Sequence, residues 1–254
     1  MFKQAIIFLF LGTFFYSYGQ VSLQSDGRQI TNGSNVGFFR GNHLPDSFLK
    51  SGNKTINYKD ISGTPYTDNK QKMIHGIASG KLYDSEFKLL NTLFIRYNAF
   101  TDNIELSKID DGIDYFLLKK KVDAWYINLG ENMYRAYNYS LENEQKIGFF
   151  VIISKDDSKY CTLLKKEKVI FKDAVAQQNA FITASPASFR RASDTYFIKI
   201  GNSVNLIPKK KKDFLQLFLL KKELLKKHLD ANKYKLTKEK DLITIINYYN
   251  SIVI

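Results

Sequence analysis

The side chains best suited to metal binding or nucleophilic catalysis are few in this sequence and far apart. His43, His75 and His228 are the only histidines, and none has a second histidine or cysteine at metal-ligand spacing. The sequence also lacks a His-Glu-x-x-His motif and a Gly-x-Ser-x-Gly elbow. Late in a lysine-rich helical pattern, His228 suits the negative end of a helix dipole. We therefore expect structural roles for the histidines and assign no catalytic residue, no metal and no cofactor.

Cys161 is the only cysteine, so the chain can form no intramolecular disulfide. It lies in the strand-like run Tyr160–Leu164. A catalytic cysteine needs a base and an activating environment, and the neighbouring sequence offers neither. We expect a buried, inert thiol.

Two short motifs match ligand-binding loops only in part. Asp110, Asp111 and Asp114 surround Gly112, but the alternating oxygen ligands and the final glutamate of a calcium loop are absent. The stretch Gly-Asn-Lys-Thr at 52–55 lacks the upstream glycine and the Gly-Lys pair of a phosphate-binding loop. We interpret the first motif as a turn and discard the second.

The strongest charged feature is a run of four lysines just after Pro208, followed by lysine pairs at 221–222 and 226–227. Near an anionic membrane each lysine contributes about 1 kcal/mol. Four positive charges at the start of a helix oppose its dipole, which makes their presence worth testing. The alternative is a solvated approach to the helix with no binding role. The candidate contacts with an anionic surface are Lys209, Lys210, Lys211 and Lys212.

The composition is that of a folded, basic protein. The chain has 254 residues, of which 44% are hydrophobic, and a formal net charge of +13. That length allows one good core with an appendage, or two small domains. A basic exported protein can meet anionic lipid, acidic glycans or nucleic acid. Lysine far outnumbers arginine, which is the better bidentate phosphate ligand, so we expect no nucleic-acid partner.

The first nineteen residues predict export. A basic start at Lys3 precedes the apolar run 5–15, which has the length of a signal-peptide core and is too short to span a bilayer. Small residues at Ser17 and Gly19 suit cleavage, so we predict a signal peptide over residues 1–19 and a mature start at Gln20. The alternatives are an uncleaved anchor or a buried strand. No second long apolar run follows, and we expect no transmembrane segment in the mature chain.

The rest of the chain divides by pattern. Residues 20–79 are rich in turn-forming residues and predict an irregular N-terminal arm, partly ordered by docking at Val36–Phe39 and near Pro65-Tyr66. Residues 80–207 alternate apolar and polar side chains over short runs, which predicts an antiparallel β domain. Within it, residues 173–193 are expected to be a long polar connection. Gly201-Asn202 is expected to be a two-residue hairpin turn.

From Pro208 onward the apolar period becomes helical. One stripe consists of Phe214, Leu217, Phe218, Leu220, Leu224, Leu225 and Leu229, and a second of Leu242, Ile245, Ile246 and Tyr249. Residues 208–254 are therefore expected to form a two- or three-helix segment. The predicted fold class is mainly β (α+β), an antiparallel sheet or open barrel-like β domain that carries this C-terminal helical segment.

Several motifs resemble an uncharacterised family of exported Bacteroidota envelope proteins. The matching stretches are Gly63-Thr64-Pro65-Tyr66, Leu93–Asn98 with its Arg96-Tyr97-Asn98 triplet, Ile104-Glu105-Leu106, the lysine-rich Ile207–Phe218, and the ending that includes Asp241-Leu242 and Tyr248-Tyr249-Asn250. The resemblance covers residues 63–254. It implies a Gram-negative periplasm or outer-membrane periphery and carries over no catalytic residue.

Together these patterns favour a non-enzymatic exported binding or accessory protein of the bacterial cell envelope. It would lie in the periplasm, at the outer-membrane periphery or outside the cell. An envelope protein is its expected partner, with anionic lipid or glycan as the other candidate. One alternative is a periplasmic hydrolase whose carboxylates are paired only in the fold. A second is a small-ligand carrier with a lipocalin-like sheet.

Overall fold

The computed structural model describes residues 49–51, 61–67, 78–107, 115–154, 159–177 and 183–253. All of these residues belong to one compact unit, Gly37–Ile254. Outside the described residues lie the predicted signal peptide, the expected docking stretch at 36–39, His43, His75, the motif at 52–55 and the aspartates of 110–114. The predictions for those positions therefore remain predictions.

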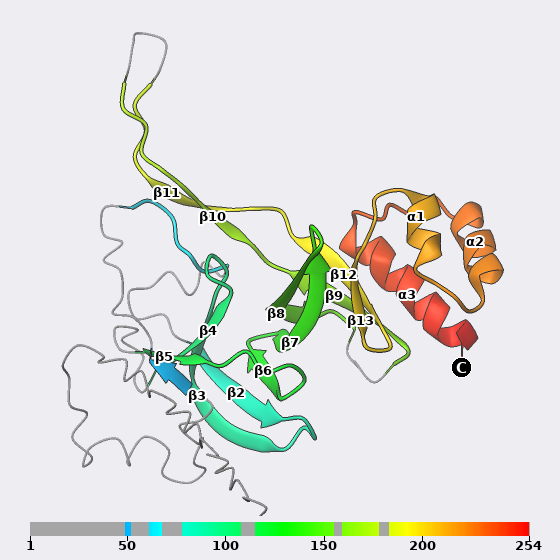
Figure 1. The fold of residues 1–254 in the computed structure, drawn as a ribbon, viewed down its shortest axis with the longest axis horizontal. Helices are drawn as coiled ribbons and strands as arrows, with labels where there is room; N and C mark the ends of the chain where they lie inside the picture. Colours follow the sequence, from blue (N-terminus) through cyan, green and yellow to red (C-terminus); the bar gives the residue numbers. More distant parts are fainter. Residues whose placement is uncertain are drawn as a thin grey trace, which may run out of the picture. The chain divides into compact units, whose positions relative to one another are not determined.

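The strands that period-two alternation predicts are present, and their ladders are antiparallel. The large sheet contains β1 (Leu49–Ser51), β2 (Ala78–Asp84), β3 (Leu89–Asn98), β4 (Asn103–Ser107), β5 (Tyr115–Leu118), β6 (Trp125–Leu129), β7 (Asn132–Leu141), β8 (Glu144–Ile152), β9 (Cys161–Lys166), β12 (Thr195–Ile200) and β13 (Ser203–Leu206). Their order in space is β1-β5-β4-β3-β2-β6-β7-β8-β9-β12-β13 (Figure 1). The prediction of a mainly β, antiparallel fold is confirmed.

The sheet curls without closing into a barrel. Its edge strands are β1 and β13, yet β13 also lies against β7, so the last five strands surround a shared layer of side chains. In that layer Tyr137, Tyr139, Phe150 and Phe197 meet edge to face, with ring centroids 5.1 to 6.1 Å apart. These aromatic rings form one core of the protein.

Side-chain alternation along β9 and β12 separates this aromatic core from the helical segment. Leu164 and Phe197 point into the aromatic core, whereas Leu163 and Ile198 point to the opposite face and pack against the helices. A third core is lined by side chains of β2 to β8 and contains Trp125. The helices are therefore attached through an apolar face of the sheet.

Two-residue turns set the register of two hairpins. Gly201 has a φ of 57° and joins β12 to β13, which confirms the predicted turn at Gly201-Asn202. Glu142 and Asn143 join β7 to β8 with φ values of 54° and 64°, the left-handed pair of a type I′ turn. β7 extends to Leu141, where this turn begins.

The polar connection predicted for residues 173–193 is wrong in part. Strand β11 (Ser188–Arg191) lies within it and pairs with β10 (Val169–Lys172) in a separate two-stranded ribbon. A bridge between Val175 and Ser185 extends the ribbon. Phe189 anchors the ribbon, because its ring is buried and lies 5.0 Å from the ring of Phe171.

The range predicted as an irregular arm contributes to the sheet at several points. β1 pairs with β5 at one edge, and β2 begins at Ala78. The carbonyl of Pro65 accepts hydrogen bonds from the amides of Ala99 and Phe100 at 3.0 and 3.3 Å. The expected docking near Pro65-Tyr66 is therefore present.

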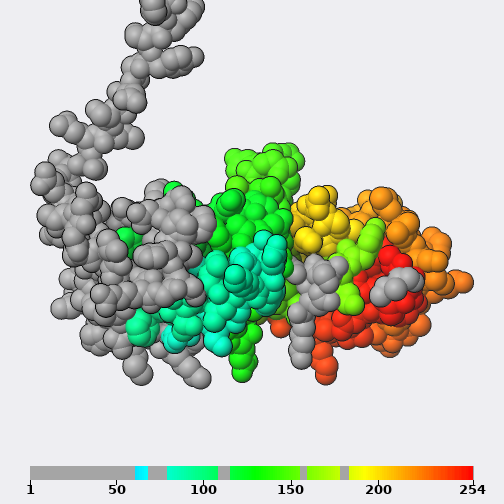
Figure 2. All heavy atoms as spheres, turned by 90° about the horizontal axis from the view of Figure 1, so that it is seen from below, coloured from blue at the N-terminus to red at the C-terminus, as the bar shows by residue number. Residues whose placement is uncertain are grey.

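Three helices complete the described chain: α1 (Lys211–Gln216), α2 (Lys222–Ala231) and α3 (Glu239–Val253). α3 lies along β9, and the helices stand beside the strands in both views (Figures 1 and 2). The continuous stripe predicted through Leu220 and Leu224 is wrong there, because the chain breaks between α1 and α2 and leaves both leucines exposed. Among the described helices, none has the length and apolarity to cross a bilayer.

Candidate functional site

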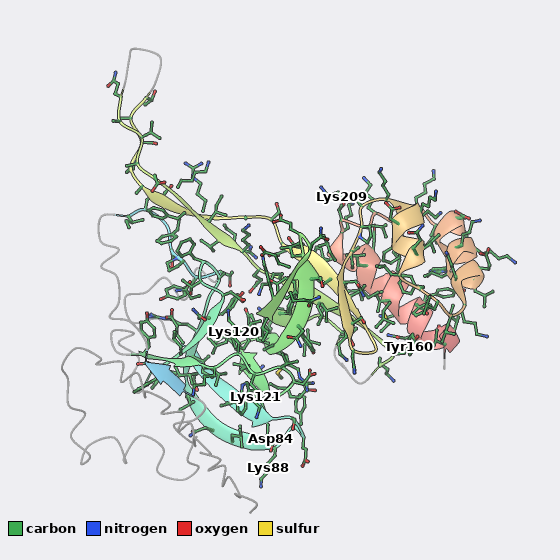
Figure 3. The ribbon with its side chains drawn as sticks, viewed as in Figure 1. Asp84, Lys88, Lys120, Lys121, Tyr160 and Lys209 are labelled. Carbon is green, nitrogen blue, oxygen red and sulfur yellow. The ribbon has the colours of Figure 1, made fainter. Side chains whose placement is uncertain are left out.

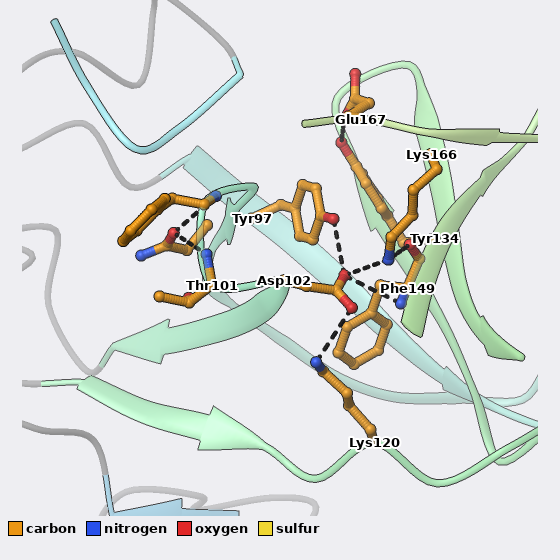
Figure 4. A network of polar contacts seen from close by, with 10 residues as sticks. Tyr97, Thr101, Asp102, Lys120, Tyr134, Phe149, Lys166 and Glu167 are labelled. Atoms are coloured by element: carbon orange, nitrogen blue, oxygen red, sulfur yellow. Dashed lines mark hydrogen bonds and ion pairs between the residues drawn. The ribbon is translucent and has the colours of Figure 1, made fainter. Parts of the chain in front are cut away.

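Asp102 is the central acceptor of a polar cluster that joins three parts of the sheet (Figure 4). Its Oδ1 accepts hydrogen bonds from the Tyr97 hydroxyl at 2.8 Å, the Lys166 ammonium at 2.6 Å and the Phe149 amide at 3.2 Å. Its Oδ2 lies 3.1 Å from Nζ of Lys120. Lys166 also donates to the Phe149 carbonyl at 2.7 Å. One carboxylate therefore ties the β3–β4 turn to β8 and to the end of β9.

Local backbone chemistry puts Asp102 at this point. In the turn after β3, the side-chain oxygen of Asn98 accepts hydrogen bonds from the amides two and three residues later. Asp102 follows with a φ of 56°, a conformation that aspartate tolerates better than most residues. On β8, Gly148 leaves the necessary space, since a Cβ there would lie 2.5 Å from Nζ of Lys166.

Burial shifts the pKa of two members of this cluster, Lys166 and Tyr97. Desolvation lowers the pKa of Lys166, and the neighbouring Asp102 carboxylate opposes that shift. Desolvation also raises the pKa of Tyr97 well above its usual value, and the charge of Asp102 adds to that rise. The Lys166 ammonium is further held 4.8 Å from the centre of the Phe150 ring.

A second carboxylate, Glu167, lies buried between β9 and β10. Its Oε2 accepts hydrogen bonds from the hydroxyls of Tyr134 at 2.7 Å and Thr67 at 3.3 Å, and Arg191 lies 3.6 Å from its Oε1. Burial, followed by the charge of Glu167, raises the pKa of Tyr134. Because the rings of Tyr97 and Tyr134 are 5.0 Å apart, the two carboxylate clusters adjoin.

A buried ion pair joins β3 to β4. Nε of Arg96 lies 2.5 Å from Oε2 of Glu105, and Asn98 donates to Oε1 at 2.9 Å. The Tyr66 hydroxyl donates to Glu105 at 3.1 Å, while its ring lies 4.5 Å from the Arg96 guanidinium. All four residues belong to motifs on which the family resemblance rests. Contacts within the fold therefore account for those motifs.

A lysine with a lowered pKa beside a carboxylate is a combination that enzymes also use for proton transfer or nucleophilic attack. Here the Lys166 ammonium donates to Asp102 and to Phe149, and it lies against an aromatic ring. Asp102 in turn is bonded to four donors. This arrangement holds strands together, so we assign the cluster a structural role.

The surroundings of Cys161 and His228 also indicate structural roles for these two residues. Cys161 is fully buried, and burial raises the pKa of its thiol. His228, in the last turn of α2, stacks on Tyr248 with ring centroids 3.7 Å apart, and its Nε2 lies 3.4 Å from the Tyr234 hydroxyl. In the described part of the chain, no three His, Cys, Asp or Glu side chains gather in a way that could hold a metal ion.

The predicted anionic-surface lysines stand at the start of α1. Lys209 and Lys210 precede the helix, Lys211 and Lys212 begin it, and all four are exposed. Figure 3 labels the first of them, Lys209. Lys211 forms an ion pair with Asp230 near the end of α2. One of the four charges is therefore compensated within the protein.

Two features escaped sequence analysis. Asp102 and Lys166 are 64 residues apart, and spacing of that kind carries no signal. Leu219 is 88% exposed, although its surroundings suggest a buried helical stripe. The sequence does hold a hint, because Leu-Leu-Lys-Lys at 219–222 interrupts the three- and four-residue spacing of that stripe.

Comparison with known proteins identifies no relative of this chain. No family model matches this chain, and neither does any curated protein or solved structure. The resemblance to exported Bacteroidota envelope proteins thus stays a prediction.

Proposed function

We propose that this protein is a non-enzymatic, exported binding or accessory protein of the bacterial cell envelope, and that its C-terminal helical segment provides the contact. The observation that carries the proposal is the charge of that segment. Residues 209–253 contain twelve lysines and five carboxylates, and all twelve lysines are exposed. Such a surface attracts an anionic component of the envelope.

The helical segment is built to present this charge. Phe214, Leu225 and Ile245 of the segment are fully buried, and they share one core with side chains of β9 and β12. The ion pairs Lys211–Asp230 and Lys165–Glu239 occupy two of the five carboxylates of the segment. The lysines therefore remain in large excess on a firmly attached surface.

The buried ionisable groups support a binding role over a catalytic one. Asp102, Lys166, Glu105 and Glu167 are bonded to neighbouring protein groups that link strands. A hydrolase, the first alternative, would have to use other carboxylates. The second alternative, a small-ligand carrier, needs space within the curled strands, where aromatic rings already pack.

Export is part of the proposal. It rests on the basic start and apolar run of residues 1–19, and on the family resemblance of residues 63–254. Both support a location in the periplasm, at the outer-membrane periphery or outside the cell. An envelope protein and an anionic lipid or glycan are the partners that this location offers.

An affinity pull-down from the envelope fraction tests the proposal. The tagged chain is washed at low and at high salt, and retained material is identified by mass spectrometry and lipid analysis. A matched variant with Lys209, Lys210, Lys221 and Lys222 changed to glutamine controls for the helical charge. We expect the unchanged protein to retain anionic material at low salt and the glutamine variant to lose it, because the variant lacks four of the exposed charges. High salt should weaken the same attraction, because exposed charges are screened beyond about 8–10 Å already at physiological salt.

Each result of this pull-down bears on the proposal. Anionic lipid or glycan that is lost at high salt supports binding through the lysines. A stoichiometric protein that survives high salt supports the accessory role and identifies its complex. Retention of nothing in either wash contradicts the proposal and favours the hydrolase or ligand-carrier alternatives.

A further inference from the structure

The connection between α1 and α2 exposes apolar side chains in the most basic part of the protein. Leu219 is 88% exposed, Leu220 49% and, one turn into α2, Leu224 43%. Lys221 and Lys222 follow these two leucines directly and are exposed as well. We call this set, together with Tyr160, the loop patch.

The loop patch has a fixed backbone. Phe218, the residue before Leu219, is buried, with its ring 5.0 Å from Phe214 and 4.5 Å from Tyr249. The Tyr249 hydroxyl donates to the carbonyl of Leu220 at 3.1 Å. The leucines are therefore held outward by the packing beneath them, and binding would require little further ordering.

Tyr160 belongs to the same surface. It directly precedes β9, is 40% exposed, and has its ring 6.2 Å from the ring of Tyr249, which also holds the loop. Figure 3 shows Tyr160 at the opposite side of the helical segment from Lys209. The apolar surface is thus separate from the lysine run that the sequence singles out. Tyrosine is enriched where proteins meet the interface of a bilayer.

We propose that the loop patch docks on the surface of an anionic phospholipid bilayer, with Leu219 and Leu220 entering the interface and the lysines on the headgroups. This inference rests on the proposed binding function and names its partner. Peripheral membrane proteins bury apolar side chains in the bilayer interface while neighbouring lysines are attracted to anionic headgroups.

Charge decides between this occupant and a second copy of the chain. Two loop patches in contact would bring together two helical segments, each with twelve lysines and five carboxylates. Like charges at such an interface oppose association. An anionic bilayer accepts the same leucines and is attracted by the same lysines.

Vesicle flotation with the predicted mature chain, which starts at Gln20, tests the inference. Vesicles of phosphatidylglycerol and phosphatidylethanolamine are compared with neutral phosphatidylcholine vesicles, and the apolar run of residues 5–15 is absent from every variant so that it cannot itself bind lipid. We expect binding to the anionic vesicles only. Leu219→Ser should lower the partition coefficient about tenfold, because it removes the most exposed apolar side chain. Leu89→Ser, at an exposed leucine of β3, is the matched control and should leave binding unchanged.

A pair of lysine variants separates the loop patch from general charge. Lys221→Asn with Lys222→Gln removes two charges at the loop, and asparagine suits the φ of 51° at position 221. Lys209→Gln with Lys210→Gln removes two charges at the other end of α1. We expect the double variant at 221 and 222 to reduce binding more than tenfold, and the double variant at 209 and 210 to reduce it less than about fivefold.

Several outcomes would overturn this inference. Equal losses from the two lysine pairs, with Leu219→Ser unchanged, would mean that net charge alone attracts the protein. Absence of vesicle binding, with a protein partner retained in the pull-down, would refute the lipid partner and leave the proposed binding function standing. A retained protein that Leu219→Ser releases would identify a protein as the occupant of the loop patch.

Discussion

Asp102 accepts hydrogen bonds from four donors, whereas Lys166 donates to two acceptors. Substitution of the two residues should therefore have different effects on stability. Lys166 has a side chain that is only 15% exposed, and Asp102 supplies its opposite charge. Asp102 would keep Tyr97, Lys120 and the Phe149 amide if Lys166 were removed. Removing the carboxylate is therefore worse than removing the ammonium.

We expect Asp102→Asn to lower the free energy of unfolding by about 3 kcal/mol, because a buried ammonium loses its counter-charge. Asparagine tolerates the φ of 56° at this position, so the backbone is not the cause. Lys166→Met keeps an apolar stem and should cost about 1 kcal/mol. Urea unfolding followed by the fluorescence of Trp125, the only tryptophan, measures both changes.

The double variant is the control for this pair. Because the two residues interact directly, the combined loss should be smaller than the sum of the single losses. Equal losses from the single variants, or additive losses in the double variant, would contradict the assigned roles.

The individual residues of this cluster could not have been found from the sequence. Asp102 follows an ordinary turn signal, and Lys166 is one lysine among many. What pairs them is the alignment of the β3–β4 turn beside β8 and β9, which depends on strand order. In contrast, the burial of Cys161 follows from its strand-like neighbours and was predicted correctly.

Among the elements, α3 and β9 are joined by the side chain of Asn250, which makes the backbone hydrogen bonds that a neighbouring strand would otherwise make. The ladder between β8 and β9 ends at Ile152 and Leu164. The Leu163 carbonyl still accepts from the Ile153 amide, and the Leu163 amide donates to the Ser154 hydroxyl. At the first residue of β9, Asn250 of α3 takes the place of the neighbouring strand, accepting from the Cys161 amide at 3.0 Å and donating to its carbonyl at 2.7 Å. This pair of bonds fixes the helical segment to the sheet.

Cys161 can report on this junction. Asn250→Ala removes both hydrogen bonds and leaves a buried amide and carbonyl unpaired, at a cost of about 2 kcal/mol. Local opening should become easier by that amount, so the rate at which a thiol reagent labels Cys161 should rise about 30-fold. Asn247→Ala changes the same residue type at an exposed site of α3 and should leave the rate unchanged. Equal rates in both variants would show that Asn250 does not hold the junction.

Element prediction succeeded where local chemistry was distinctive and failed where packing decided. Gly201-Asn202 has the residue types that a left-handed turn requires, and its hairpin is present. The turn at Glu142-Asn143 begins with a glutamate at positive φ, which no propensity suggests. β11 was missed because its strand character comes from Phe189 and its partner β10.

At the scale of the whole molecule, the strands of the large sheet contribute side chains to three separate cores. Tyrosines take part in each of them. Burial raises the pKa of Tyr97, Tyr134 and Tyr139, and it raises the pKa of Tyr196 and of Tyr249 to about 12. Protonation of these hydroxyls is therefore coupled to the folding of all three cores.

This coupling predicts alkaline unfolding. A tyrosine in the unfolded chain ionises near pH 10, whereas these folded tyrosines keep their protons to higher pH. Their contribution to stability is complete below about pH 10 and is lost as the pH rises toward their folded values. Lys166 acts in the opposite sense, because its lowered pKa makes the folded state easier to maintain as the pH approaches 10.5. Since five tyrosines oppose one lysine, stability should fall.

The urea midpoint measured from about pH 8 to about pH 11 should therefore decline gently above about pH 8.5, where the thiol of Cys161 ionises in the unfolded chain but not in the core, and then drop steeply above about pH 10. Lys166→Met removes the opposing gain, so its drop should be steeper than that of the unchanged protein. Tyrosine absorbance recorded in the same samples should rise together with unfolding, because the buried hydroxyls ionise when the cores open. A midpoint that stays level through pH 11, or a rise in absorbance well before unfolding, would mean that these tyrosines ionise within the folded state and that the cores do not depend on their protons.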